Sequence, residues 1–236
     1  MKAAVGDHRR QAVLPRHSLV WIRPDARDQV AATAPDKAAR DSIVQWLDRD
    51  LPLIVRRRDP GLRSHLIALG APLPPSQGKR RIGVIAESAA MVRGCDPPLV
   101  AEIVDRLPIA WRAALSKLAF GTTCDLKFHV VGSALWEALT GLSYLHVNSD
   151  VDLVSRLRDP LDIPKLCECL ARWEARHARR VDCEMEFPDG SAVAWREWFA
   201  TQPDAQVLVK RTDGVVLRSK RALVRCLGAF PQRRAA

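Results

Sequence analysis

Short apolar runs and one helix-like pattern occupy the N-terminal third of the chain. They comprise an apolar run at residues 18–22, a helical spacing of apolar side chains at 38–47 and a second run at 51–55. Apolar residues three or four positions apart share one face of a helix, whereas runs of about four to eight apolar residues fit buried strands. These segments predict a small α+β unit.

A segment rich in proline and glycine interrupts both patterns at residues 70–78. It contains three closely spaced prolines between two glycines, and neither a helix nor a central strand accommodates such a sequence. We interpret the segment as a linker. This interpretation predicts an N-terminal domain at 1–72, a linker at 73–81 and a second domain at 82–236.

The longer second part alternates between strand and helix patterns. Strands are predicted at 81–86, 127–131, 149–154 and 181–187, helices on both sides of Pro108 within 98–120 and at 134–142 and 163–179, and a strand or short helix at 191–199. Alternation of polar and apolar side chains at 149–154 and 181–187 indicates strands with one buried face. We therefore expect an α+β chain whose second domain is a mixed sheet packed by helices.

Composition adds a preference for negatively charged ligands. The chain has 236 residues, 47% hydrophobic and 27% charged, which is typical of a globular protein and excludes disorder or a coiled coil. Its 37 Lys and Arg residues exceed its 27 Asp and Glu residues by ten, which favours a polyanionic ligand or an acidic partner. No apolar run is long enough for a membrane span, and residues 1–13 lack the apolar core of a secretion signal, so we expect a cytoplasmic protein without membrane contact.

Two segments have residue types suited to phosphate. Gly132 and Ser133 close a predicted strand and open a helix, where unpaired backbone N–H groups and the helix dipole favour a phosphate. Arg56 and Arg57 follow a predicted strand directly, and arginines at a strand end can contact phosphate with two nitrogens at once. Such a basic cluster is more often a solvated surface than a binding site, so it is a secondary candidate.

Carboxylates gather on the two strands that follow the Gly-Ser turn. Asp150 and Asp152 are separated by one residue, which places both carboxylates on one face of a strand. Asp182 and Glu184 share a face of the next acidic strand, which supplies a third carboxylate. Carboxylate oxygens are the ligands that Mg²⁺ prefers, and the pattern therefore predicts a magnesium site.

The order of these features resembles the nucleotidyltransferase superfamily of the DNA polymerase β type. A narrower resemblance is to the malonate decarboxylase holo-acyl-carrier-protein synthases, also called phosphoribosyl-dephospho-CoA transferases. It is carried by residues 131–146, which read Val-Gly-Ser-Ala-Leu-Trp-Glu-Ala-Leu-Thr-Gly-Leu-Ser-Tyr-Leu-His, and by Ser-Asp-Val-Asp-Leu at 149–153. Further similar blocks lie at 182–184, 188–190 and 193–197, and the resemblance extends from about Arg16 to Val224.

This resemblance implies a donor, an acceptor and roles for particular residues. The donor is triphosphoribosyl-dephospho-CoA, the acceptor is a serine of the apo acyl-carrier subunit of malonate decarboxylase, and pyrophosphate is released. Asp150 and Asp152 correspond to the catalytic, magnesium-binding aspartates of the family. Asp182, with Glu184 as the next choice, is the third carboxylate, and Lys210 is a candidate to hold the triphosphate.

Two other functions use the same features. A different nucleotidyltransferase could modify a small molecule or an RNA end with a nucleoside triphosphate. A non-catalytic nucleic-acid-binding module would use the excess of basic residues. No known motif for reading RNA or DNA occurs, and aromatic residues make up only 6% of the chain, so few side chains can stack on bases and we expect no nucleic-acid partner.

Overall fold

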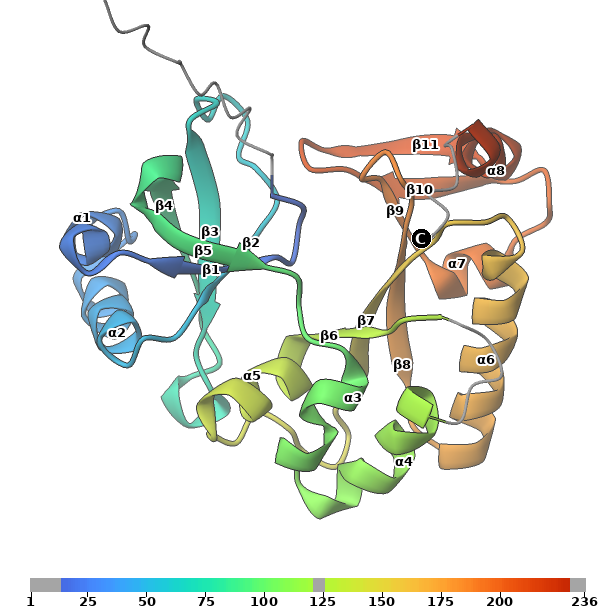
Figure 1. The fold of residues 1–236 in the computed structure, drawn as a ribbon, viewed down its shortest axis with the longest axis horizontal. Coiled ribbons are helices and arrows are strands. Elements are labelled where there is room, and N and C mark those ends of the chain that lie inside the picture. Colours follow the sequence, from blue (N-terminus) through green and yellow to red (C-terminus); the bar gives the residue numbers. More distant parts are fainter. Residues whose placement is uncertain (1–13, 121–125, 230–236) are drawn as a thin grey trace, which may run out of the picture.

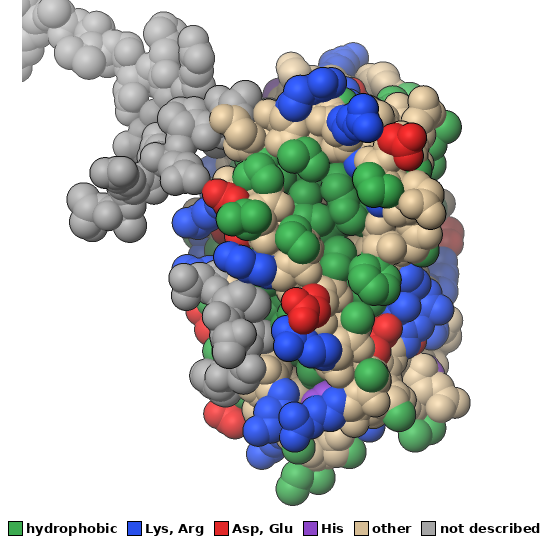
Figure 2. All heavy atoms as spheres, turned by 90° about the vertical axis from the view of Figure 1, so that its right-hand side faces the viewer, with side chains coloured by type: hydrophobic (Ala, Val, Ile, Leu, Met, Phe, Trp, Pro, Cys, Tyr) green, Lys and Arg blue, Asp and Glu red, His purple; other side chains and the backbone are tan. Residues whose placement is uncertain are grey.

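The computed structural model describes residues 14–120 and 126–229 and has an α+β fold with two sheets (Figure 1). The α+β class predicted from the sequence is confirmed. Eight α-helices occur within the two described ranges. No helix in these ranges is both long and apolar enough to cross a membrane. The outer face of the C-terminal half mixes hydrophobic with basic side chains (Figure 2).

The N-terminal half is a five-stranded antiparallel sheet in the order β4-β3-β2-β1-β5. Its elements are β1 (Leu19–Ile22), α1 (Arg27–Ala32), α2 (Lys37–Asp48), β2 (Leu53–Val55), β3 (Leu66–Pro72), β4 (Arg81–Glu87) and β5 (Met91–Cys95). The Asp36 carboxylate caps α2 by accepting a hydrogen bond of 2.7 Å from the Ala39 N–H. The helix predicted at 38–47 and the strand at 51–55 are confirmed as α2 and β2.

The C-terminal half is a six-stranded sheet in the order β11-β10-β9-β8-β7-β6. Its strands are β6 (His129–Val131), β7 (Val151–Arg156), β8 (Val181–Glu186), β9 (Ala192–Ala194), β10 (Gln206–Lys210) and β11 (Val215–Ser219). Its helices are α3 (Val100–Ile103), α4 (Ile109–Phe120), α5 (Gly132–Thr140), α6 (Asp162–His177), α7 (Trp195–Ala200) and α8 (Lys220–Ala229). β7 and β8 run parallel because α6 crosses between them, and this pair makes the sheet mixed.

The linker predicted at 73–81 is wrong. β3 and β4 on its two sides pair with each other in continuous register from Leu66↔Glu87 to Pro72↔Arg81, so the segment is the loop of a hairpin inside the first sheet. Its prolines lie at the end of β3 and in a short 3₁₀ helix, and Gly78 closes the turn with φ of 82°. The predicted limits 1–72 and 82–236 therefore cut one sheet in two, whereas the first sheet continues to the end of β5.

Contacts between the two halves fix their relative position. Buried apolar residues of both halves form one continuous core, in which the rings of Trp46 and Trp136 pack edge to face with centroids 5.3 Å apart. The Tyr144 hydroxyl donates a hydrogen bond of 2.9 Å to the Pro72 carbonyl. On the other side, the Arg58 N–H donates to the Thr212 carbonyl at 2.9 Å. The two sheets therefore face each other across a defined space.

Candidate functional site

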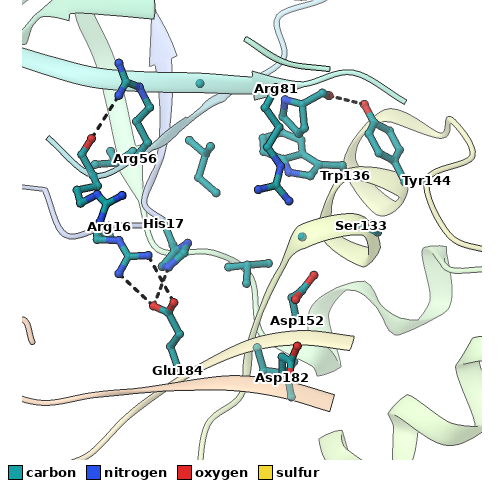
Figure 3. Close-up of a pocket in the computed structure, with 18 of the residues that line it drawn as sticks. Arg16, His17, Arg56, Arg81, Ser133, Trp136, Tyr144, Asp152, Asp182 and Glu184 are labelled. Atoms are coloured by element: carbon teal, nitrogen blue, oxygen red, sulfur yellow. Dashed lines mark hydrogen bonds and ion pairs between the residues drawn. The ribbon is translucent and has the colours of Figure 1, made fainter. Parts of the chain in front are cut away.

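A cleft of about 740 Å³ lies between the two sheets (Figure 3). Both halves contribute to its wall, and the side chains that line it include eight Lys or Arg residues and three carboxylates. The predicted residues Gly132, Ser133, Asp152 and Asp182 come together here. Such an excess of positive charge around a small acidic cluster suits a ligand with several phosphates.

The turn from β6 into α5 brings the backbone against a carboxylate. Gly132 begins α5 with φ of 62°, in the left-handed region that glycine adopts without strain. A Cβ atom at this position would overlap the carboxylate of Asp152. Both the positive φ and the close contact with Asp152 therefore require glycine at this position. The first N–H groups of α5 lie beside the Asp152 side chain, where they are available to a phosphate.

The register of β7 and β8 places two of the predicted carboxylates next to each other. Asp152 pairs with Asp182 in this parallel ladder, and Asp150 lies just before β7. Burial and the negative charges of Asp182 and Asp150 raise the pKa of Asp152 to about 6, although Arg81 and His17 act in the opposite direction. An acidic residue held in this way binds protons or cations readily.

Asp150 takes a different position from the other two carboxylates. It does not line the cleft, and it contacts Arg180, whose Nε lies 3.6 Å from Asp150 Oδ2 and 3.4 Å from Asp182 Oδ1. Within residues 14–120 and 126–229, no three His, Cys, Asp or Glu side chains are gathered into a ready metal site. The donor set still suits Mg²⁺, because its oxygens are hard ligands and a cation would relieve the repulsion that raises the pKa of Asp152.

Glu184, the alternative third carboxylate, is already surrounded by cations. Arg16 Nη1 and His17 Nε2 each lie 3.2 Å from Glu184 Oε2, and Lys210 Nζ lies 2.7 Å from Oε1. Burial raises the pKa of Glu184, but the hydrogen bond from His17 and the charges of its neighbours outweigh burial and lower it. Lys210, predicted to hold the triphosphate, lines the cleft and forms an ion pair with Glu184. The carboxylate beside Asp152 is that of Asp182.

The predicted phosphate contacts Arg56 and Arg57 also line the cleft. Both terminal nitrogens of Arg56 donate to the Asp59 carboxylate at 2.6 Å, and its Nε donates to the Leu69 carbonyl at 3.2 Å. Its side chain lies over Gly83, where a Cβ would be only 3.3 Å from Arg56 Nε. The Arg56 guanidinium is therefore held by the protein itself.

Sequence reasoning did not identify three residues that the structure brings to the site. Arg81 points across the cleft toward Ser133 and Asp152, and Arg16 and His17 reach Glu184 from the N-terminal segment (Figure 3). Arg81 could be noticed only as part of the basic run at 79–81. Arg16 and His17 had no distinguishing pattern, because their partner lies more than 160 positions away.

Comparisons with known proteins agree over nearly the whole chain. Residues 15–97 match the family model for the phosphoribosyl-dephospho-CoA transferase MdcG N-terminal domain, and residues 98–221 match that for the MdcG C-terminal domain. A protein of Xanthomonas campestris pv. campestris (strain 8004) named phosphoribosyl-dephospho-CoA transferase is 40% identical over 94% of this chain and 99% of its own length. A protein of the same name from Bradyrhizobium diazoefficiens is 31% identical over 89% of this chain and 92% of its own length. No solved structure matches the chain.

Proposed function

The chain belongs to the phosphoribosyl-dephospho-CoA transferase family, and we propose that its acceptor is a serine of the apo acyl-carrier subunit of malonate decarboxylase. In the proposed reaction the donor is triphosphoribosyl-dephospho-CoA and the second product is pyrophosphate. The transferase activity follows from the family. The acceptor serine and the leaving group are part of the proposal, and the chemistry of the cleft supports them.

One observation carries the proposal. The N-terminus of α5 at Gly132 and Ser133 meets the neighbouring carboxylates of Asp152 and Asp182 inside a cleft lined by arginines and lysines. A phosphate chain needs backbone donors and cations, and transfer to a hydroxyl needs carboxylates close to the reacting phosphorus. The same order of strand, Gly-Ser turn, helix and acidic strands supports a C-terminal half of the nucleotidyltransferase type.

The proposed chemistry is a displacement at phosphorus. The serine oxygen forms a bond to the phosphorus next to the ribose, the bond from that phosphorus to the pyrophosphate oxygen breaks, and the serine proton passes to the Asp182 carboxylate. Asp150, Asp152 and Asp182 are the residues that would hold Mg²⁺, whose charge would offset that of the phosphates. The first N–H groups of α5 hold the phosphate chain in position.

Intact-mass spectrometry of the carrier tests the proposal. The apo carrier is incubated with enzyme, triphosphoribosyl-dephospho-CoA and Mg²⁺, and we expect a mass gain of one phosphoribosyl-dephospho-CoA group together with release of pyrophosphate. Asp152→Asn should slow the transfer by roughly a thousandfold, since several kcal/mol of transition-state stabilisation are lost. Asp105→Asn, which changes an exposed carboxylate in a short 3₁₀ helix of the C-terminal half, should leave the rate unchanged.

Three further reactions complete the design. A carrier with Ala in place of its acceptor serine should gain no mass, and a chelator should stop the transfer to the normal carrier. Parallel reactions offer a nucleoside triphosphate with RNA or with small hydroxyl compounds. Labelling of these acceptors without labelling of the carrier would refute the proposed acceptor and favour another nucleotidyltransferase.

A further inference from the structure

The positive side chains of the cleft fall into two groups. Five of the eight Lys and Arg residues that line it have carboxylate partners. These paired residues are Arg16, Arg56, Arg180, Arg196 and Lys210. The other three are Arg57, Lys79 and Arg81, whose side chains contact no carboxylate within the described ranges. All three belong to the N-terminal half, so the positive charge that remains available for a ligand comes from that half.

Arg81 is the member of this group that points at the reacting centre. It opens β4, in which the buried residues Ile82 and Val84 alternate with the less buried Arg81 and Gly83, and both Arg81 and Gly83 line the cleft. Its guanidinium extends toward Ser133 and Asp152 (Figure 3). The N-terminus of α5 and the Asp152 carboxylate thus face, across the cleft, a guanidinium that forms no ion pair with the residues that the structure describes.

We infer that Arg81 binds the polyphosphate of the donor, and in particular the pyrophosphate that departs. This inference rests on the proposed function and extends it, because it gives the N-terminal half a direct role at the reacting group. A guanidinium donates two parallel hydrogen bonds to phosphate oxygens, which a lysine cannot do. When the phosphorus–oxygen bond breaks, the pyrophosphate gains negative charge, and a cation already facing that position stabilises the change.

The adjacent residue provides a matched control. Arg80 precedes Arg81 directly, but its Nη2 lies 2.8 Å from Asp36 Oδ2, on the side of α2 and away from the cleft. Both partners of that ion pair are about half exposed, so its loss should change stability little. Arg80→Gln and Arg81→Gln therefore remove the same charge at neighbouring positions, and only the second removes a group from the cleft.

Calorimetric binding of inorganic tripolyphosphate tests the inference without any transfer reaction. In buffer of fixed ionic strength without divalent cations, Arg81→Gln should weaken binding by about tenfold or more, since a charge-assisted pair of hydrogen bonds is lost. Arg80→Gln should stay within about twofold of the unchanged protein. Arg81→Lys should recover part of the affinity, because a lysine restores the charge but not the paired hydrogen bonds.

Kinetics with the full donor give a second readout. Arg81→Gln should lower kcat/KM for the donor by about a hundredfold, as expected when one group that stabilises developing charge is removed. Equal tripolyphosphate affinity in the Arg81 and Arg80 variants, or no binding by the unchanged protein, would overturn the inference. If binding depends on Arg81 but the carrier gains no mass, the inference stands and the proposed acceptor is refuted.

Discussion

At the scale of single residues, the site is built from groups that a stable fold would not select on its own. Asp152 is largely buried beside two other carboxylates, and burial and those charges raise its pKa to about 6. Gly132 holds a left-handed backbone in contact with the same carboxylate. Functional sites commonly combine such locally unfavourable choices, and the surrounding packing compensates for them. Two predictions follow from this unfavourable environment.

Replacing the buried carboxylate by its amide should stabilise the metal-free protein. Because the pKa of Asp152 is raised in the folded state above its unfolded value of about 3.9, ionisation opposes folding as pH rises from about 4 to about 6. Asp152→Asn removes that cost, so its free energy of unfolding at pH 7 should exceed that of the unchanged protein by about 2 kcal/mol. Denaturant unfolding with a chelator present measures the difference.

The pH series supplies the control for this prediction. The two proteins should have similar stability below about pH 4, where both side chains are neutral. Addition of Mg²⁺ should then stabilise the unchanged protein more than Asp152→Asn. A variant that is less stable than the unchanged protein at pH 7 in the chelator would contradict the electrostatic account.

Gly132→Ala should abolish the transfer reaction because of a steric clash in addition to backbone strain. The new methyl group would overlap the Asp152 carboxylate and displace it, so the transfer rate should fall by about a hundredfold or more. The matched control is Gly141→Ala at the other end of α5. Gly141 also has a positive φ, of 70°, but a Cβ there meets nothing within 4 Å.

Both variants should therefore lose about 1 kcal/mol of stability from backbone strain, Gly132→Ala should lose more because of the overlap with Asp152, and only Gly132→Ala should lose the transfer reaction. Thermal unfolding and the carrier mass assay measure the two effects separately. Similar activity in the two variants would show that the contact with Asp152 is unimportant.

At the scale of elements, the parallel pair β7–β8 and the crossover helix α6 align the carboxylates, and β8 also anchors the N-terminal segment. Glu184 lies two ladder pairs beyond Asp182, on the same strand face, and contacts Arg16, His17 and Lys210. β8 thus places the Asp182 carboxylate in the site, and its Glu184 carboxylate contacts Arg16 from the N-terminal half and Lys210 from the C-terminal half. His17 takes part with a left-handed backbone, φ 69°, which histidine tolerates better than most residues.

Glu184→Gln should destabilise the protein at neutral pH. The side chain of Glu184 is 17% exposed, and its loss of charge leaves Arg16 and Lys210 without their shared anion, at a cost of about 3 kcal/mol. The pKa of Glu184 is lowered in the folded state, so its stabilisation is present above the unfolded pKa of about 4.3 and disappears as pH falls. Unfolding curves should show a large difference at pH 7 and a clearly smaller one at about pH 2, well below the unfolded pKa, where protonation of the folded state removes the stabilisation.

The control substitution is Glu168→Gln on the exposed side of α6. Its ion pair with Arg172 joins two side chains that are more than 60% exposed, so the change should cost less than about 0.5 kcal/mol at either pH. Equal effects of the two substitutions would mean that the cations around Glu184 find other partners.

Local pattern was enough to predict the elements that carry the carboxylates. The strand-turn-helix at Gly132, the strand with Asp152 and the alternating strand with Asp182 were predicted because each depends on neighbouring residues. The hairpin loop at 73–80 was mistaken for a linker because prolines and glycines produce the same signal in both. The hairpin β10–β11 is local but was not predicted. The placement of Arg81 and the partners of Glu184 escaped prediction because they depend on contacts between distant parts of the chain.

At the scale of the whole molecule, the two halves contribute different chemical groups to the cleft. The C-terminal half provides the carboxylates and the N-terminus of α5, while the N-terminal half provides Arg57, Lys79 and Arg81, which have no carboxylate partner among the described residues. The boundary after β5 coincides with the limits of the two matched family domains, at residues 97 and 98. Basic side chains also occur on the outer face of the C-terminal half, so positive potential extends beyond the cleft (Figure 2).

The net charge of +10 should make capture of the donor sensitive to salt. Raising the ionic strength from about 0.05 to about 0.5 M shortens the Debye length to a few ångströms, so kcat/KM for the donor should fall several-fold. The kcat at saturating donor should change much less, since the bound phosphates are shielded inside the cleft. Steady-state kinetics at several salt concentrations measure both values, and a kcat/KM that is independent of salt would contradict electrostatic capture.

The contact between Arg16 and Glu184 also has a consequence for how the protein is made. These residues are 168 positions apart, and a ribosome adds about 5 to 20 residues per second, so Arg16 emerges roughly ten to thirty seconds before its partner. The first sheet ends at Cys95 and can form in that interval, including the hydrogen bond from the His17 N–H to the Val55 carbonyl, whereas the side chains of Arg16 and His17 must wait for Glu184. The cleft is therefore completed late in synthesis, when β8 supplies the Glu184 carboxylate that the side chains of Arg16 and His17 contact.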